Sequence, residues 1–408
     1  MGKTLLWVLA CASVLLLAYE AWTLLVLVLR PLLSNPNAIQ TDFHYYYDAA
    51  RRFTADRQRL YQLSDDVIAG FAYPPPAIVP FMWLARWPLG TALLAWTIIS
   101  YLMILVASQQ WLKYLRANGY VIDRNTAIAA GLVAFAIGPT YMNAIFGQVN
   151  AFVLASAVAF VRLAPVAAME AGILLALGTW LKIYPAFLAV IGLWDRRTWK
   201  AIAWTIAFGI VIALVLLPVV SLPTYRIFLF DVLARRIDKT AIQITNQSLV
   251  AFIERFRFAP DFYTYWTGQE AVTVSTLGAA INLAFAAIAA VLLAIVRIPQ
   301  EHKAAALMAL IAVIAPLGWG HTYVMVLPLV MLQLIAMRNA SAIVAVITTV
   351  CVLAFVVPAG RRLPIDFMPD WLENIVYSRY LLATMLLMVI SSNRVVGQKP
   401  ESTIIASA

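Results

Sequence analysis

The sequence is poor in charge, in cysteine and in histidine. Only 12% of its 408 residues are Asp, Glu, Lys or Arg, about half the share in a typical soluble domain. By contrast, 63% of the residues are hydrophobic and the mean hydropathy is +0.87. This composition predicts a polytopic, all-α integral membrane protein, in place of the two or three soluble domains that the length alone would suggest.

The patterns that bind metals and nucleotides are also missing. The two cysteines, Cys11 and Cys351, lie in apolar runs, where cysteine usually packs as a small hydrophobic residue. No His/Cys cluster, no Asp-x-Asp pair in an outer loop, no P-loop and no dinucleotide fingerprint occurs. We therefore expect no cofactor and no metal requirement, and neither an ATP-driven pump nor a soluble nucleotide-sugar enzyme.

The excess of basic residues points to lipid or phosphate, not to nucleic acid. The chain has 29 Lys and Arg against 19 Asp and Glu, a net charge of +10. These cations gather at the ends of apolar runs and in loops, where they meet lipid headgroups or a phosphate-bearing substrate.

Eight apolar runs are long enough, or nearly so, to cross a bilayer. They cover residues 4–29, 88–112, 201–220, 272–297, 304–318, 321–337, 341–358 and 375–391. Between 126 and 194, polar and proline-containing turns cut the apolar sequence into four shorter pieces. We predict about twelve helices, some short or broken. The first run continues to Leu29, so it is read as a retained span and not as a cleaved signal peptide.

Basic groups orient these helices, because they favour the cytoplasmic side. The groups are Lys3, Lys113 to Arg124, 195–200, Arg297 with Lys303, Arg338 and the tail 394–408. Placing all of them inside requires an even number of crossings between Arg124 and Asp195. This predicts a single transmembrane domain over 1–393, a cytoplasmic tail over 394–408, and outer loops 30–75 and 221–270 that form a loop-helix cap.

The two outer loops break the positive-inside rule. They contain Arg30, Arg51, Arg52, Arg57 and Arg59, then Arg226, Arg235, Arg236, Lys239, Arg255 and Arg257. Either the orientation is inverted, or these cations bind an anionic phosphate at the outer membrane surface.

The stretch TDFHYYYDAARRF, at 41–53, concentrates titratable side chains directly after the first span. Asp42 is the first carboxylate of the outer loop and a candidate general base for an acceptor hydroxyl, although most surface carboxylates are only solvated. The segment predicts an amphipathic helix, on which Tyr45, Tyr46 and Asp48 are candidates to line a cavity. Arg51 and Arg52 are candidates to bind a donor phosphate or sugar.

Polar residues also interrupt later apolar runs. Gln148 and Asn150 need hydrogen-bond partners at membrane depth, which neighbouring helices or a sugar would supply. Lys182 costs roughly 3 kcal/mol at the centre of a bilayer, so a lysine here suggests a phosphate contact, with Tyr184 beside it. Tyr73, in a proline-rich turn, is a further candidate to line the cavity.

Two more motifs allow a structural and a functional interpretation. Asn246 and Gln247 either start a helix or bind sugar hydroxyls. His321 either is a structural histidine or relays a proton or binds phosphate where a helix opens on the outer face. Trp319 and Tyr323 flank it and are candidates to line the same cavity.

Taken in order, six segments of this chain form a family pattern. They read TDFHYYYDAA, FAYPPPAIVPFMWL, GQVNAFVLA, WLKIYPAFL, NQSL and PLGWGHTYVMVLP, between about residue 40 and residue 337. This ordered set resembles glycosyltransferase family 87, a group of polytopic GT-C-type membrane enzymes. Its best-known members are mannosyltransferases that extend phosphatidylinositol mannosides.

The resemblance implies a polyprenyl-phosphate sugar donor, often mannose, and a lipid or glycolipid acceptor at the outer face of a bacterial cytoplasmic membrane. Asp42 matches the catalytic aspartate that deprotonates the acceptor. His321 matches a histidine near the donor phosphate or in a proton relay, and Lys182 a candidate phosphate contact. One carboxylate at the point of attack suits an inverting displacement of the lipid phosphate.

Two other functions are compatible with parts of the sequence. A transporter or flippase of lipids or lipid-linked sugars would need charges at the bilayer midplane and usually an inverted repeat, which the sequence does not show. A non-catalytic lipid-binding subunit would make Asp42 dispensable. The sugar itself stays open among mannose, arabinose, galactose and glucose.

Overall fold

The chain begins with a long helix that changes its winding as it crosses the molecule. In this computed structural model, α1 (Gly2–Thr23) continues as a π-helical turn, Leu24–Leu29, and then as α2 (Arg30–Ser34). The structure describes residues 1–35, 41–61, 70–258, 271–361, 363, 365 and 367–393. Parts of the two predicted outer loops and the predicted tail 394–408 therefore lie outside the described residues.

Helices account for nearly all of the regular structure that follows. The α-helices are α3 (Asp42–Ala55), α4 (Val79–Leu84), α5 (Leu89–Ala117), α6 (Arg124–Ala136), α7 (Gly138–Ile145), α8 (Asn150–Leu163), α9 (Ala168–Leu181), α10 (Trp199–Leu216), α11 (Leu222–Ile227), α12 (Leu249–Phe258), α13 (Thr276–Ile295), α14 (Gln300–Ile314), α15 (Leu327–Ala336), α16 (Ala342–Val356), α17 (Asp370–Tyr377) and α18 (Arg379–Asn393). The longer 3-10 segments are η4 (Tyr184–Leu193) and η8 (Gly320–Val326). One antiparallel pair of strands, β1 (Lys239–Ala241) and β2 (Ala271–Thr273), completes the described elements.

The structure confirms an all-α membrane protein but not a count of twelve spanning helices. Five described segments are long and apolar enough to cross a bilayer: Gly2–Leu32, Leu89–Ala117, Arg196–Leu216, Thr276–Ile295 and Gly320–Asn339. Two bent pairs, α6 with α7 (52°) and α17 with α18 (63°), raise that number to seven if each pair is one span. Other apolar helices, such as α8, α9 and α16, are shorter.

The breaks in the apolar sequence between 126 and 194 are helix boundaries, as predicted. Pro139 stands in the first turn of α7, and the turn around Pro165 separates α8 from α9. The segment from Lys182 to Pro185 separates α9 from η4. Proline lacks an amide proton and clashes with the preceding helical turn, so it starts or ends helices in preference to continuing them.

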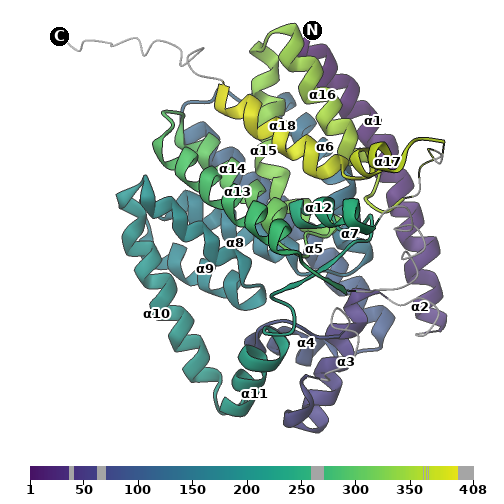
Figure 1. Cartoon of the computed structure of the whole chain (residues 1–408), viewed down its shortest axis with the longest axis vertical. Coiled ribbons are helices and arrows are strands. Elements are labelled where there is room, and N and C mark those ends of the chain that lie inside the picture. Colours follow the sequence, from purple (N-terminus) through teal and green to yellow (C-terminus); the bar gives the residue numbers. More distant parts are fainter. Residues whose placement is uncertain are drawn as a thin grey trace.

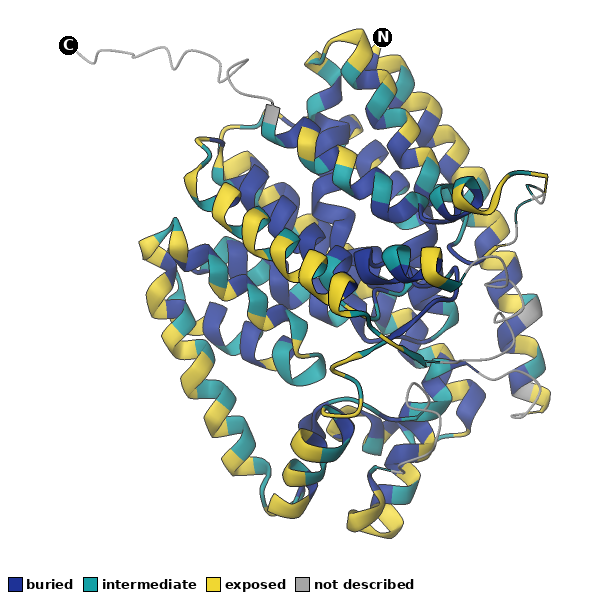
Figure 2. Ribbon diagram, viewed as in Figure 1, coloured by how far each residue is buried: buried dark blue, intermediate teal, exposed yellow. Residues whose placement is uncertain are grey.

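The core surrounds a central group of helices. From Glu301 to Val313 every residue of α14 is buried, and η8 and most of α15 are buried with it. By contrast, α10 and α13 run along the outside with exposed apolar side chains, as Figure 2 shows. Apolar residues that remain exposed along a whole helix fit contact with lipid tails.

Several of the predicted cytoplasmic groups contact one another or their neighbours at one end of the molecule, named here the basic end. Arg338 pairs with Asp123 at 2.8 Å and donates to Thr126 at 2.7 Å. Tyr120 hydrogen-bonds His302 at 2.8 Å, and the Lys303 ammonium lies 5.6 Å from the centre of the Trp194 ring. The two ends of the segment from Arg124 to Asp195 thus lie at the same end of the molecule, as an even number of crossings requires. The crossings themselves and the orientation to the cytoplasm stay predictions.

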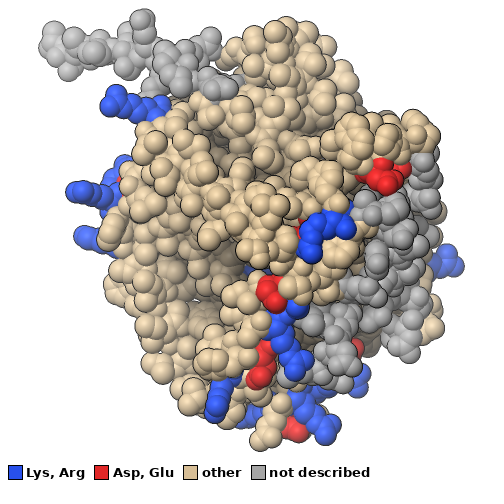
Figure 3. All heavy atoms as spheres, viewed as in Figure 1, with Lys and Arg blue, Asp and Glu red and all other residues tan. Residues whose placement is uncertain are grey.

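The opposite end, named here the site end, is built from the predicted outer segments. Helix α5 runs from one end to the other. Near its start, Leu93 packs against Gly147 at the site end. Near its finish, Arg116 donates to the carbonyl oxygen of Ile122 at the basic end. Figure 1 shows α3, α4 and α11 together at the site end, below α5 and α9. Figure 3 shows a broad uncharged surface across the middle of one face, with basic side chains gathered along the lower edge. A periplasmic position for this end stays a prediction.

Candidate active site

Asp42 is held at the first turn of α3. Thr41 caps this helix in a reciprocal pair with His44, whose Nδ1 accepts from the Thr41 amide at 3.0 Å. The amide of Phe43 donates to the carbonyl oxygen of Phe146 at 3.0 Å, which fastens the start of α3 to the turn before Gly147. A helix N-terminus carries positive partial charge, so this position favours the carboxylate form of Asp42.

Gly147 allows the two segments to meet. Its φ of +64° is a left-handed conformation, which residues with a side chain rarely adopt. A Cβ atom here would lie 2.7 Å from Phe43 Cβ and 2.9 Å from Leu93 Cδ1. Glycine therefore brings Gln148 beside Asp42.

We expect Gly147→Ala to lower both stability and activity. The strained backbone alone costs about 1–3 kcal/mol, and the contacts with Phe43 and Leu93 force the start of α3 away from Gln148. Gly119→Ala is the matched control, because Gly119 also has a positive φ, +91°, but nothing lies within 4 Å of the added Cβ. Thermal unfolding and sugar transfer measured for both variants check this. Equal losses in the two variants would contradict the packing argument.

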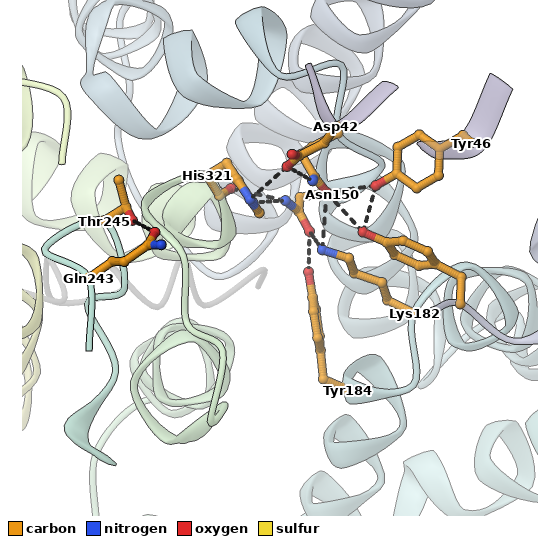
Figure 4. A network of polar contacts seen from close by, with 10 residues as sticks. Asp42, Tyr46, Asn150, Lys182, Tyr184, Gln243, Thr245 and His321 are labelled. Atoms are coloured by element: carbon orange, nitrogen blue, oxygen red, sulfur yellow. Dashed lines mark hydrogen bonds and ion pairs between the residues drawn. The ribbon is translucent and has the colours of Figure 1, made fainter. Parts of the chain in front are cut away.

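Two nitrogen groups approach the same oxygen of Asp42. Gln148 Nε2 donates to Oδ2, and His321 Nε2 lies 3.7 Å from that oxygen (Figure 4). Within the described part of the chain, no hydrogen bond or ion pair reaches Oδ1. A third of the side-chain surface of Asp42 is exposed. One carboxylate oxygen thus remains available to an incoming hydroxyl group.

Lys182 lies behind these groups, at the junction of α9 and η4. Its ammonium donates to Asn150 Oδ1 at 2.8 Å and to Gln148 Oε1 at 3.3 Å. The rings of Tyr73 and Tyr184 have their centres 5.4 and 5.6 Å from Nζ, within the range of cation–π attraction.

Three tyrosine hydroxyls complete the polar cluster. The Tyr46 hydroxyl lies 2.6 Å from that of Tyr73 and 2.9 Å from Gln148 Oε1. The Tyr184 hydroxyl donates to Asn150 Oδ1 at 2.6 Å. We define the polar cluster as Asp42, Tyr46, Tyr73, Gln148, Asn150, Lys182, Tyr184 and His321.

The surroundings change the acidity of its charged members. Burial raises the pKa of Asp42 above its usual range, although the hydrogen bond from Gln148 and the charge of Lys182 act in the opposite direction. Burial lowers the pKa of Lys182 to about 7, opposed by the charge of Asp42. A carboxylate with a raised pKa is a stronger base, which suits proton abstraction near neutral pH.

A paired loop positions His321. The amide of Gln247 donates to the Gly318 carbonyl oxygen at 2.8 Å, and that of Gly320 to the Thr245 carbonyl oxygen at 2.9 Å. These bonds align 245–247 with 318–320, one residue before His321. His321 is 4% exposed, with its ring edge-on to Phe146.

Asn246 and Gln247, predicted to bind phosphate or sugar, have no exposed surface. The side-chain amide of Asn246 donates to the carbonyl oxygens of Ala241 and Pro316, and that of Gln247 to the carbonyl oxygens of Ile244 and Tyr377. These contacts hold the loop of His321. Ligand binding by either residue stays a prediction, and the structure gives both a positioning role.

Arg255 corrects one expectation from the sequence. Phosphate binding was one of two alternatives for the outer-loop cations, but Arg255 has no exposed surface. Its guanidinium donates to the carbonyl oxygens of Ile242 and Gln243 at 3.0 and 2.9 Å and to Ser378 Oγ at 2.9 Å. That alternative does not apply to Arg255, because backbone carbonyl oxygens and Ser378 occupy the guanidinium.

The remaining sequence candidates lie outside the polar cluster. Asp48 is exposed, since six residues turn a helix by about 240° and carry it away from the face of Asp42. Arg51 and Arg52 stand near the end of α3, about 14 Å along the axis from Asp42. Tyr45 and Trp319 are half-buried. Tyr323 is fully buried and donates to the Gln247 carbonyl oxygen at 2.6 Å.

The sequence did not single out Arg236 as a site residue. In the structure its positive charge acts on the Tyr73 hydroxyl, so this guanidinium is close enough to the polar cluster to interact with it electrostatically. In the sequence, Arg236 appears only as one of the basic residues of the second outer loop.

An apolar cavity of about 590 Å³ adjoins the polar cluster between α9, η4 and α10. Its lining is almost wholly apolar and includes Pro74, Trp180, Ile183, Gly209, Phe228 and Leu229. Pro74 follows Tyr73 directly, and Ile183 stands between Lys182 and Tyr184. The cavity therefore lies close to the cluster along the chain, although no residue of the cluster is among those that line it.

The described residues contain no group of three or more His, Cys, Asp or Glu side chains that would hold a metal ion. Independence from metals and cofactors stays a prediction, since an absence of ligand clusters does not test it.

Comparison with known proteins supplies the family. No curated protein matches this chain. A sequence profile described as Glycosyltransferase family 87 matches residues 71–328, a range that includes Gln148, Asn150, Lys182 and His321 but begins after Asp42. Because the match covers more than half of a helical membrane chain, the chain belongs to glycosyltransferase family 87.

Proposed function

We propose that this glycosyltransferase is an inverting enzyme that uses a polyprenyl-phosphate sugar. It moves a hexose, with mannose as the first candidate, to a hydroxyl of a lipid or glycolipid at the outer face of a bacterial cytoplasmic membrane. The observation that carries the proposal is the position of Asp42, with one carboxylate oxygen that accepts no hydrogen bond within the described residues, in a cluster with the half-buried Lys182 and close to an apolar cavity.

The reaction needs one base and one stabilised leaving group. Asp42 Oδ1 takes the proton of the acceptor hydroxyl, whose oxygen then attacks the anomeric carbon of the donor. The bond between that carbon and the phosphate oxygen breaks, and the phosphate leaves with the electron pair. Lys182 and Arg236, whose charges act on Asp42 and on Tyr73, are the candidates to stabilise that charge. Attack from the face opposite the phosphate inverts the anomeric centre.

The apolar cavity supports a lipid-linked donor over a nucleotide sugar. A prenyl chain gains roughly 0.8 kcal/mol for each methylene-sized group that it buries, and the cavity wall offers it almost only carbon atoms. A nucleotide base and ribose would leave their polar atoms without partners in such a space.

Membership of the family favours the transferase over the flippase that the sequence left open. Both would bind a lipid-linked sugar, but only the transferase needs a base beside the anomeric carbon. The contacts of Asp42 support that role, since both nitrogen groups approach Oδ2 and leave Oδ1 to an acceptor.

A donor panel tests the proposal. Purified protein would receive radiolabelled polyprenyl-phosphate mannose, glucose, galactose or arabinose, with a membrane lipid extract as acceptor and matching nucleotide sugars as controls. We expect label to move to a new lipid from one polyprenyl-phosphate sugar only, with inverted anomeric configuration. We also expect full activity in EDTA. Transfer from a nucleotide sugar would contradict the lipid-linked donor, and retention of configuration would contradict the inverting mechanism. Activity lost with EDTA and restored by Mg²⁺ would contradict metal independence.

A further inference from the structure

Asn150 connects Lys182 with His321, and all of its side-chain hydrogen-bonding capacity is used. Oδ1 accepts from Lys182 Nζ at 2.8 Å and from the Tyr184 hydroxyl at 2.6 Å. Nδ2 lies 2.9 Å from His321 Nδ1 and donates to the His321 carbonyl oxygen at 3.2 Å. The residue has no exposed surface. No group of Asn150 is left to bind a sugar hydroxyl.

Lys182 determines which way the Asn150 amide points. An ammonium group only donates hydrogen bonds, so the amide atom 2.8 Å from Nζ is the carbonyl oxygen. The amide nitrogen must then face His321, and an amide nitrogen also only donates. His321 Nδ1 is therefore the acceptor of this bond and carries no proton. In a neutral imidazole the single proton must stand on Nε2.

That proton points at the catalytic carboxylate. His321 Nε2 lies 3.7 Å from Asp42 Oδ2, as Figure 4 shows for the row Lys182, Asn150, His321 and Asp42. Gln148 repeats the arrangement, since Lys182 also donates to Gln148 Oε1 and Gln148 Nε2 donates to Oδ2. One lysine thus orients two amides, and both lead to the same oxygen of Asp42.

We propose that Asn150 is a positioning residue that fixes His321 as the tautomer with the proton on Nε2. His321 then donates a hydrogen bond to Asp42 or to a substrate oxygen, and Asp42, not His321, is the base that takes the acceptor proton. The consequence for catalysis rests on the proposed function, whereas the tautomer does not. This assignment excludes a proton relay in which neutral His321 takes a proton at Nε2.

The nitrogen NMR spectrum of protein labelled with ¹⁵N-histidine tests the tautomer without any substrate. The chain has only three histidines, and His321→Gln identifies the signals of His321 by their loss. We expect the wild-type Nδ1 to give the signal of an unprotonated nitrogen and Nε2 that of a protonated one. A proton on Nδ1 in the wild-type protein would overturn the proposal, whatever the variants do.

Asn150→Asp is the informative variant, because it keeps the shape and both acceptor contacts to Lys182 and Tyr184. Its second oxygen faces His321 where the wild type has a donor, so Nδ1 should gain a proton. The signals of His44 and His302 serve as internal controls and should not move. An unprotonated Nδ1 in a folded Asn150→Asp protein would overturn the proposal.

Activity gives the second readout. With a donor found active for the wild type, Asn150→Asp should lower kcat about 100-fold, since Nε2 then either presents a lone pair to Asp42 or belongs to a charged imidazolium. Asn150→Ala removes the amide donor that favours the tautomer with the proton on Nε2, but it adds no acceptor beside Nδ1. Its kcat should therefore fall less than that of Asn150→Asp. A larger loss in the alanine variant would mean that Asn150 acts through packing and would overturn the tautomer role. The failure of every donor would count against the proposed function and leave the NMR test decisive for Asn150.

Discussion

Asp42→Asn is expected to transfer sugar at less than about one thousandth of the wild-type rate. The asparagine has nearly the same shape, and its oxygen can still accept a hydrogen bond from Gln148, so the protein should fold. It cannot take a proton from the acceptor hydroxyl, and the attacking oxygen then stays protonated. Single-turnover transfer from the active donor measures the chemical step directly.

Asp48→Asn is the matched control for Asp42→Asn. Both residues lie on α3 and both substitutions remove one negative charge, but Asp48 is exposed. We expect Asp48→Asn to keep the wild-type rate. Turnover retained in Asp42→Asn would remove the base from the mechanism, and equal losses in both variants would point to the charge of α3 as the cause.

The pH dependence follows from the raised pKa of Asp42. The base works in its deprotonated form, so kcat/KM should fall as the pH drops through this pKa, at a pH above the usual range of an aspartate. The profile of kcat/KM reports the free enzyme. An acid limb that stays in the usual range of an aspartate would contradict the assignment of that limb to Asp42.

Lys182→Met should have the second-largest effect, a fall in kcat/KM of about 100-fold or more. The substitution removes the half-buried cation that the proposed mechanism assigns to the leaving phosphate, and it also frees the two amides that Lys182 orients. Donor binding and transfer should therefore both weaken. Lys200→Met, at an exposed lysine of the basic end, is the control and should leave both unchanged.

Lys182 also predicts an alkaline limb. Its pKa is lowered to about 7, so in the free enzyme the charge is present below this pH and is lost as the pH rises through it. In the wild type kcat/KM should fall over that interval, and in Lys182→Met this fall should be absent. If Lys182→Met keeps the same alkaline limb, the fall in kcat/KM is caused by the titration of another group.

Much of this protein follows from the order of its residues. The apolar runs predict a helical membrane protein, because hydrocarbon forces the backbone to pair within its own segment. The prolines and polar turns between 126 and 194 mark real helix ends, since proline acts on its own neighbours. The motifs with Asp42, Gln148, Asn150, Lys182 and His321 predicted site residues that the structure does bring together.

Only the tertiary structure decided what each polar side chain contacts. The same residue type is a surface cation at Arg51 and a buried support at Arg255, and no local pattern distinguishes them. Asn246 and Gln247 hold a loop, whereas Asn150 orients a histidine far away in the sequence. The physical reason is that hydrogen bonds depend on distance and direction between helices, and those are set by packing contacts such as that of Gly147 against Phe43.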